Sequence, residues 1–144
     1  MIWLLAAMAV LAIGMAAVGP LWARAAQRER EAALIRVGVA YARAIEHYYA
    51  LSPGRAKTLP RSVGDLLIDP RFEAPVHHLR DAYDDPMNPG SALEPVLSPG
   101  GDLLGVRSTS TLAPLRQASW SDGTHTLPPA AQIRDWQFLA HLSP

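Results

Sequence analysis

The fold is decided by residues 1–51, which read MIWLLAAMAVLAIGMAAVGPLWARAAQREREAALIRVGVAYARAIEHYYAL. Residues 1–23 contain no charged side chain, and the chain then passes into a charged helical pattern without an obvious break. A segment of about 20 apolar residues, at about 1.5 Å rise per residue, crosses the roughly 30 Å hydrocarbon core of a bilayer. The stretch therefore predicts one long helix, transmembrane over residues 1–22 and amphipathic over residues 23–51.

The amphipathic part carries one apolar stripe. Its members are spaced by three or four positions, as on one face of a helix: Leu34, Val37, Tyr41, Ile45 and Tyr48. We expect this stripe to pack against the rest of the chain; a coiled-coil seam is the alternative, although the stripe is only about two heptads long. Pro20 predicts a kink, and residues 52–54, Ser-Pro-Gly, predict the end of the helix.

Two interpretations of the apolar segment are open. As a membrane anchor, it would place in lipid or in a helix–helix contact the residues Trp3, Leu4, Leu5, Met8, Leu11, Ala12, Ala16, Pro20 and Trp22. Small residues such as Ala12 and Ala16 let helices pack closely in lipid. As a secretory signal peptide, the segment would be cleaved after Ala25. The long apolar run and the lack of basic residues before it favour the anchor.

Residues 52–144 predict a small α+β domain. The chain has 13 prolines and ten glycines, most of them beyond Leu51, so we expect many loops. We predict a short helix over 61–68, one or two helical turns within 74–83, a hairpin of 92–97 with 102–109, a loop over 120–131 and a last strand over 135–140. Pro95 places the first hairpin strand at a sheet edge. This order of elements predicts a small antiparallel sheet.

The overall charge balance and the composition argue against several functions. Thirteen basic and 13 acidic residues give no basic excess for nucleic acid or for a polybasic lipid site. There is no cysteine, hence no disulfide and no thiol chemistry. No nucleophile motif such as G-x-S-x-G is present. A small hydrolase is therefore disfavoured, and a secreted or periplasmic binding module is the stronger alternative to an anchored protein.

The most specific motif lies at residues 78–87, which read HLRDAYDDPM. The spaced residues that define it are His78, Leu79, Arg80, Tyr83, Asp85, Pro86 and Met87. Residues 100–108 follow as GGDLLGVRS, residues 59–60 read Leu-Pro, and residues 135–138 read DWQF. With the long N-terminal helix, these motifs resemble the pseudopilins of the type II secretion system, which belong to the type IV pilin-like proteins.

The resemblance implies a structural subunit, not an enzyme, with no cofactor. It implies a single span in the inner membrane, a periplasmic C-terminal domain and assembly by helix–helix packing into a pseudopilus. The implied partners are other pseudopilin subunits, inner-membrane secretion components and membrane lipid, without nucleic acid or a small-molecule substrate. Type IV pilus and competence minor pilins share this plan and are an alternative.

One departure from the family concerns the start of the chain. Family members begin with a basic leader and a Gly-Phe-Thr-Leu-x-Glu stretch, which prepilin peptidase cuts after the glycine, whereas Trp3 here takes the place of the glutamate. We expect a start codon further upstream; a member without the processing site is the alternative. An upstream basic leader would also offset the four arginines that follow the segment, which otherwise favour a cytoplasmic domain under the positive-inside rule: Arg24, Arg28, Arg30 and Arg36.

Metal binding is the remaining question about the side chains. Asp84, Asp85 and Asp102 could supply oxygens to calcium, as a loop of the family's major subunits does, but the residues of that loop are not matched here. Asp85 more readily caps and turns the chain. His77 and His78 would point about 100° apart on a helix, so we expect His78 to be a structural hydrogen-bonding residue.

Overall fold

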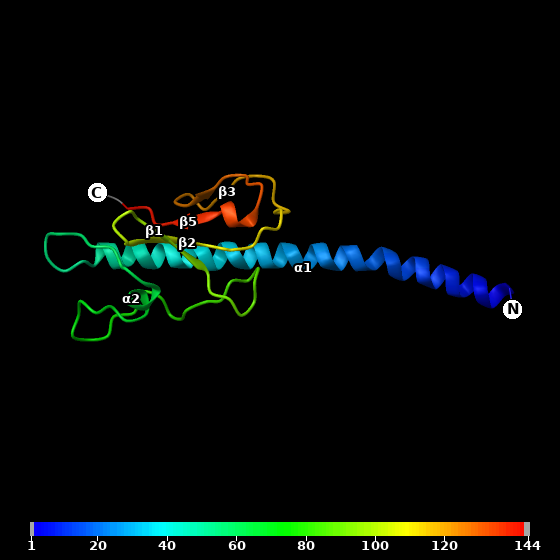
Figure 1. Ribbon diagram of the computed structural model, residues 1–144, viewed down its shortest axis with the longest axis horizontal. Coiled ribbons are helices and arrows are strands. Elements are labelled where there is room, and N and C mark those ends of the chain that lie inside the picture. Colours follow the sequence, from blue (N-terminus) through cyan, green and yellow to red (C-terminus); the bar gives the residue numbers. More distant parts are fainter. Residues whose placement is uncertain (1, 143–144) are drawn as a thin grey trace.

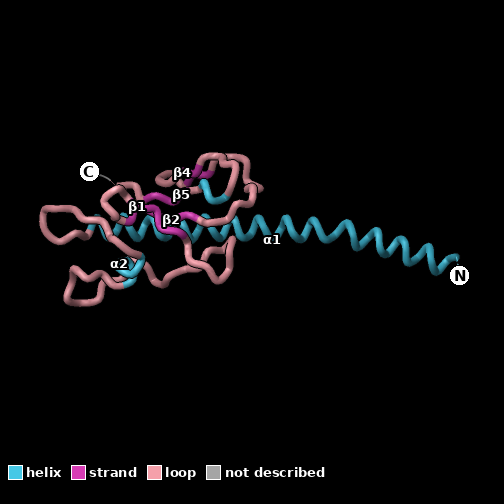
Figure 2. The backbone as a smooth tube through the Cα atoms, viewed as in Figure 1, coloured by secondary structure: helices cyan, strands magenta, loops and turns pink. Residues whose placement is uncertain are grey.

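The chain forms one long helix with a small domain around its C-terminal half (Figure 1). The computed structural model describes residues 2–142, and the side chains within that range except those at positions 5, 6 and 9–19. Helix α1 runs over Ile2–Ala50 and includes Pro20. The strands lie along one side of its C-terminal half and α2 lies on the other, while its N-terminal part projects away (Figure 2). The fold is α+β, as the sequence predicts.

Helix α2 (Val63–Leu67) begins with a capping box. The Ser62 hydroxyl accepts the N–H of Asp65 at 3.3 Å, and the Asp65 carboxylate accepts the N–H of Ser62 at 3.2 Å. These two hydrogen bonds satisfy backbone donors that a helix start leaves unpaired. The helix lies inside the predicted range 61–68, and Leu66 on it is fully buried.

The predicted helical turns within residues 74–83 are wrong. No helix is assigned to this stretch, because its backbone bonds to the α2 region instead of to itself. The N–H groups of His78 and Leu79 both donate to the carbonyl of Leu66 at 2.9 Å, and the carbonyl of Val76 accepts the N–H of Asp69 at 2.9 Å.

The main sheet is antiparallel with strand order β1-β2-β5. Strands β1 (Glu94–Leu97) and β2 (Leu103–Arg107) form the predicted hairpin, and Pro95 lies on the edge strand as expected. Gly101 has a φ of 86° in the turn between them, a conformation that glycine adopts without steric cost. Strand β5 (Gln137–Leu139) pairs with β2 on the other side and follows a 3₁₀ turn, η1 (Ile133–Asp135).

The loop predicted over residues 120–131 contains a second hairpin. Strands β3 (Trp120–Ser121) and β4 (Thr126–Leu127) pair with each other. The Asp122 carboxylate accepts the N–H groups of Thr124 at 3.0 Å and His125 at 2.7 Å, which fixes the turn between the strands. Two strands of two residues each leave no alternating pattern in the sequence, and composition alone therefore suggests a loop.

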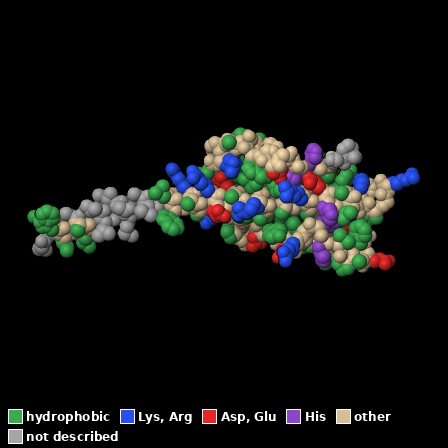
Figure 3. Space-filling view, turned by 180° about the vertical axis from the view of Figure 1, so that it is seen from behind, with side chains coloured by type: hydrophobic (Ala, Val, Ile, Leu, Met, Phe, Trp, Pro, Cys, Tyr) green, Lys and Arg blue, Asp and Glu red, His purple; other side chains and the backbone are tan. Residues whose placement is uncertain are grey.

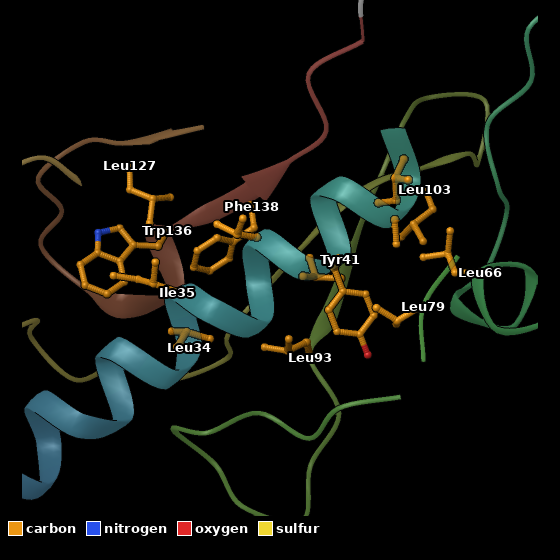
Figure 4. Close-up of a cluster of buried hydrophobic side chains, with 14 of the residues drawn as sticks. Leu34, Ile35, Tyr41, Leu66, Leu79, Leu93, Leu103, Leu127, Trp136 and Phe138 are labelled. Carbon is orange, nitrogen blue, oxygen red and sulfur yellow. The ribbon is translucent and has the colours of Figure 1, made fainter. Parts of the chain in front are cut away.

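The hydrophobic core lies between α1 and the elements on both sides of it (Figure 4). Trp136 and Phe138 reach α1 from the β5 side, and Leu66 and Leu79 reach it from the α2 side. Helix α1 and strand β5 approach each other closely at Gly38, where a Cβ atom would lie 2.2 Å from the ring of Phe138. A glycine at this helix position therefore sets the distance between α1 and β5.

Candidate functional site

The described side chains in the N-terminal part of α1 are exposed, and most of them are apolar. The exposed fractions are 89% for Trp3, 64% for Met8 and 73% for Trp22. Of the other residues predicted for the anchor, Leu4 and Pro20 are exposed, and the side chains of Leu5, Leu11, Ala12 and Ala16 lie outside the described residues. Soluble monomers rarely expose an apolar surface of this extent without a partner for it. Among the side chains that the structure describes, no helix combines the length and the hydropathy of a bilayer span.

The C-terminal half of α1 is held inside the domain. Leu34, Tyr41, Ile45 and Tyr48 of the predicted stripe are buried, and Val37 is partly buried against the same core. The buried face is wider than the stripe, since Ile35 and Val39 also belong to the core. It is wider because the sheet and α2 cover the helix from two sides.

The last turn of α1 has a partner for each of its final four carbonyl groups. The carbonyl of His47 accepts the N–H of Leu51, and that of Tyr49 accepts the hydroxyl of Ser52 at 2.8 Å. Two side chains from outside the helix supply the rest: the Tyr48 carbonyl accepts from Arg71 at 2.8 Å, and the Ala50 carbonyl accepts from Lys57 at 2.7 Å. Cations at this end also interact favourably with the helix dipole.

Arg71 is the centre of this cap. Its guanidinium donates to Asp69 through Nε at 2.9 Å and through Nη2 at 2.6 Å, so that the pair is bidentate. Nη1 donates to the hydroxyls of Ser52 and Thr58, both at 2.9 Å, and the group lies 3.5 Å from the centre of the Tyr48 ring. Asp69 is fully buried, and only 15% of the Arg71 side chain is exposed. The cluster ties the segment after α2 to the end of α1.

The electrostatics of the cluster follow from these contacts. Hydrogen bonds from Arg71 and from His78 hold the pKa of the Asp69 carboxyl well below its ordinary value of 3.8, against the effect of burial. The same carboxylate raises the pKa of Arg71. Burial raises the pKa of the Tyr48 phenol. The pair is therefore ionised throughout the physiological pH range.

The motif residue His78 extends the cluster to the polar face of α1. Its Nε2 lies 2.9 Å from an Asp69 oxygen and its Nδ1 lies 2.9 Å from Nδ1 of His47, so the side chain serves as a buried hydrogen-bonding residue. One ring nitrogen of His47 is engaged by this contact. His77 and His78 do not lie on a helix, so the helical argument against a shared metal ion does not apply to them.

The motif residue Asp85 organises the turn of residues 85–91. Its carboxylate is fully buried and accepts the N–H of Met87 at 2.9 Å, the amide of Asn88 at 3.1 Å and the hydroxyl of Ser108 at 2.7 Å. These bonds use the carboxylate to connect the motif with the end of β2. Leu79 and Met87 of the motif are buried, Pro86 is partly buried, and Arg80 and Tyr83 are exposed.

Ser108→Ala tests this connection. The variant should lower the free energy of unfolding by about 1.5–3 kcal/mol, because it removes a hydrogen bond to a buried charged group. Urea unfolding followed by tryptophan fluorescence measures the change. Ser119→Ala, at an exposed serine, should change the same quantity by less than about 0.5 kcal/mol. Equal urea midpoints of unfolding for the two variants would show that the hydrogen bond from Ser108 to Asp85 does not stabilise the domain.

Two further acidic residues of α1 hold the C-terminal segments. The Glu46 carboxylate accepts the N–H of His141 at 2.6 Å and contacts Nε2 of His125 at 2.9 Å. Glu31 is 4% exposed and accepts the backbone N–H groups of Leu115 at 2.8 Å and Arg116 at 3.2 Å. Glu46 therefore joins two C-terminal segments to α1.

Sequence reasoning missed Arg71, Asp69, Glu31 and Glu46. Glu31 and Glu46 bond to groups far along the chain, and Arg71 reaches Ser52 and the Tyr48 carbonyl from another segment, so no spacing in the sequence marks these contacts. Asp69 lies only two positions from Arg71, but no pattern in the sequence marks this pair as buried. The one available signal was Glu31 itself, an acidic residue three positions before the first residue of the stripe, Leu34, and hence on the buried side of the helix. Asp84 and Asp102 form no cluster with Asp85, and among the described residues no group of three or more histidine or acidic side chains is arranged for a metal ion.

Comparisons of this chain with protein-family models, with curated proteins and with solved structures found no match.

Proposed function

We propose that this chain is a structural subunit of a pilin-like filament, of the pseudopilin kind found in type II secretion. In this proposal it is anchored in the inner membrane before assembly, with its domain in the periplasm. One observation carries the proposal: α1 leaves the domain with its described apolar side chains exposed, and it continues without interruption into the half that the domain holds. The motifs of residues 78–87 and 135–138 point to the same family.

The filament accounts for the exposed surface. In lipid, Trp3, Met8 and Trp22 would contact acyl chains; in a filament they would contact neighbouring helices. Both environments are apolar, so moving from one to the other changes the hydrophobic free energy little. The domain would then form the outer surface, and the capped end of α1 would keep it in a fixed position on the helix.

The motif residues support the proposal through their division of roles. His78, Asp85 and Met87 hold the irregular segments of the domain in place, whereas Arg80 and Tyr83 remain exposed. A subunit needs both kinds of residue, since a rigid domain must present side chains to its neighbours. No step of catalysis is part of this proposal.

A secreted or periplasmic binding module is the second candidate. It is favoured by where the domain begins to hold α1: among the described side chains of the helix, the first that bonds to the domain is Gln27, whose amide donates to the carbonyl of Ala113 at 2.9 Å. Cleavage after Ala25 would therefore leave the described contacts of the domain intact. The two candidates differ in whether residues before Ala26 stay attached.

Fractionation of a Gram-negative bacterium that produces the chain separates these candidates. The anchored subunit should remain in the membrane pellet after a carbonate wash, and mass spectrometry of the purified chain should detect the residues before Ala26. Recovery from the soluble periplasmic fraction of a chain that starts at Ala26 would overturn the proposal and establish the binding module.

Cysteine cross-linking tests assembly beyond simple anchoring. The chain has no cysteine, so single cysteines over residues 2–22 give unambiguous cross-links. In a filament the yield should rise and fall with a period of about 3.6 residues, because one face of each helix meets its neighbours. Arg55→Cys, in an exposed loop, is the matched control and should give no cross-link through the helix core. A uniform yield along the helix would indicate an anchored monomer.

A further inference from the structure

Arginine side chains gather where α1 leaves the domain (Figure 3). Arg24, Arg28 and Arg30 lie on the helix at this point, and the loop of residues 112–117 brings Arg116 beside Arg28. We refer to these four residues as the arginine collar. All four are exposed, and in the described part of the chain the ion pairs of other arginines involve Arg36, Arg43, Arg71 and Arg107 but none of the collar.

Two residues of the collar, Arg28 and Arg116, line an open cavity of about 370 Å³ together with Glu31 and others. Glu31 does not neutralise the two arginines by direct pairing. Its oxygens instead accept the N–H groups of Leu115 and Arg116 and the amide of Gln27 at 3.0 Å. The other acidic residue nearby, Glu29, pairs with Arg36 at 3.4 Å. Among the described residues neither Arg28 nor Arg116 forms an ion pair, and both residues line the cavity, where they can meet an anion.

The position of the collar along α1 suggests the source of that anion. This step rests on the proposed membrane anchor. Residues 2–22 would span about 31 Å at 1.5 Å per residue, close to the thickness of the hydrocarbon core. Trp22 would then lie at the interface, where tryptophan is enriched, and Arg24 and Arg28 would lie at the depth of the phosphate groups. Leu112, which is 51% exposed, lies in the same loop as Arg116.

We propose that the arginine collar binds the phosphate diester of anionic phospholipid headgroups. Guanidinium groups bind phosphate oxygens through paired hydrogen bonds. Two arginines at one cavity suit a phosphate that has no other cation bound to it. An anionic bilayer surface adds attraction of about fivefold in affinity for each basic residue near it. Such binding would fix the depth and the rotation of α1 in the membrane before assembly.

Native mass spectrometry of the full chain in mild detergent tests the proposal. The chain is mixed with equal amounts of phosphatidylglycerol and phosphatidylcholine, and the ratio of the two bound lipids is measured. The natural chain should favour phosphatidylglycerol. The double variant Arg28→Gln, Arg116→Gln should lose about 25-fold of this preference. The matched control Arg55→Gln, Arg61→Gln removes the same charge from exposed sites outside the collar and should keep it.

Several outcomes would overturn the proposal. An equal ratio of the two lipids on the natural chain would exclude headgroup selection, and an equal loss in both double variants would show a general charge effect. Complete displacement of the lipid by excess inorganic phosphate would assign the cavity to the free ion. Unchanged lipid ratios together with lost subunit cross-links in the collar variant would assign the collar to an acidic protein partner.

The result also separates this inference from the proposed function. If the natural chain stays in the carbonate-washed membrane but shows no lipid preference, only the proposal that the arginine collar binds lipid is contradicted. A chain released from the membrane would contradict the anchor on which the inference depends.

Discussion

Replacing Arg71 with methionine should lower the free energy of unfolding by about 3–5 kcal/mol. The variant keeps much of the side-chain volume but leaves the fully buried Asp69 carboxylate without its bidentate partner. It also leaves the carbonyl of Tyr48 and the hydroxyls of Ser52 and Thr58 without a donor from the guanidinium. Urea unfolding of the full chain in mild detergent, followed by tryptophan fluorescence, measures the change.

Two controls define the Arg71 result. Arg55→Met removes an arginine from an exposed loop and should change the stability by less than about 0.5 kcal/mol. Arg71→Lys keeps the charge but cannot reproduce the planar fork, so its stability should fall between those of Arg71→Met and the natural chain. The cap would be unimportant if Arg71→Met unfolded at the same urea concentration as Arg55→Met.

The same cluster predicts a dependence of stability on pH. The pKa of Asp69 is lower in the folded chain than its ordinary value of 3.8, because Arg71 and His78 donate hydrogen bonds to the carboxylate. Its contribution is therefore present above pH 3.8 and is lost as the pH falls from there toward the folded pKa. Asp69→Asn should flatten this acid slope; the remaining slope should include Asp122, whose pKa is lowered by the N–H groups of His125 and Thr124. An unchanged slope in Asp69→Asn would contradict the assignment.

Gly38→Ala should lower the free energy of unfolding by about 1–3 kcal/mol. Alanine is the better helix former by about 1 kcal/mol, so in the absence of a close contact the substitution would stabilise α1. The added Cβ would lie 2.2 Å from the Phe138 ring, however, and α1 and β5 must separate to admit it. The sign of the change therefore reports the contact directly.

A second background makes the Gly38 test specific. In Phe138→Ala the ring is absent, and Gly38→Ala should there become neutral or stabilising, a coupling between the two sites that a double-mutant cycle measures. Gly64→Ala is the matched control, because the nearest atom to its Cβ is the Ser62 hydroxyl at 3.4 Å, an ordinary contact. A loss of stability in Gly38→Ala that persists without the Phe138 ring would point to another cause.

The features predicted well from the sequence are those that neighbouring residues decide. The long helix, its apolar stripe, the short helix at Val63–Leu67 and the hairpin of β1 and β2 each follow from a local period or from turn residues. The predictions failed where a distant partner replaced local bonding. Residues 74–83 bond to the α2 region instead of forming turns of helix, and β3 and β4 are too short to leave a pattern.

The sequence by itself determined that an uncharged segment adjoins an amphipathic helix, since charge and helical period are properties of consecutive residues. Only the tertiary structure decided which polar groups meet. It placed Arg71 and Asp69 under the end of α1 and brought Arg116 beside Arg28 in a chain whose total charge is zero. The physical reason is that a buried carboxylate or an unpaired carbonyl can be satisfied by any donor that the fold brings near, whatever its distance along the chain.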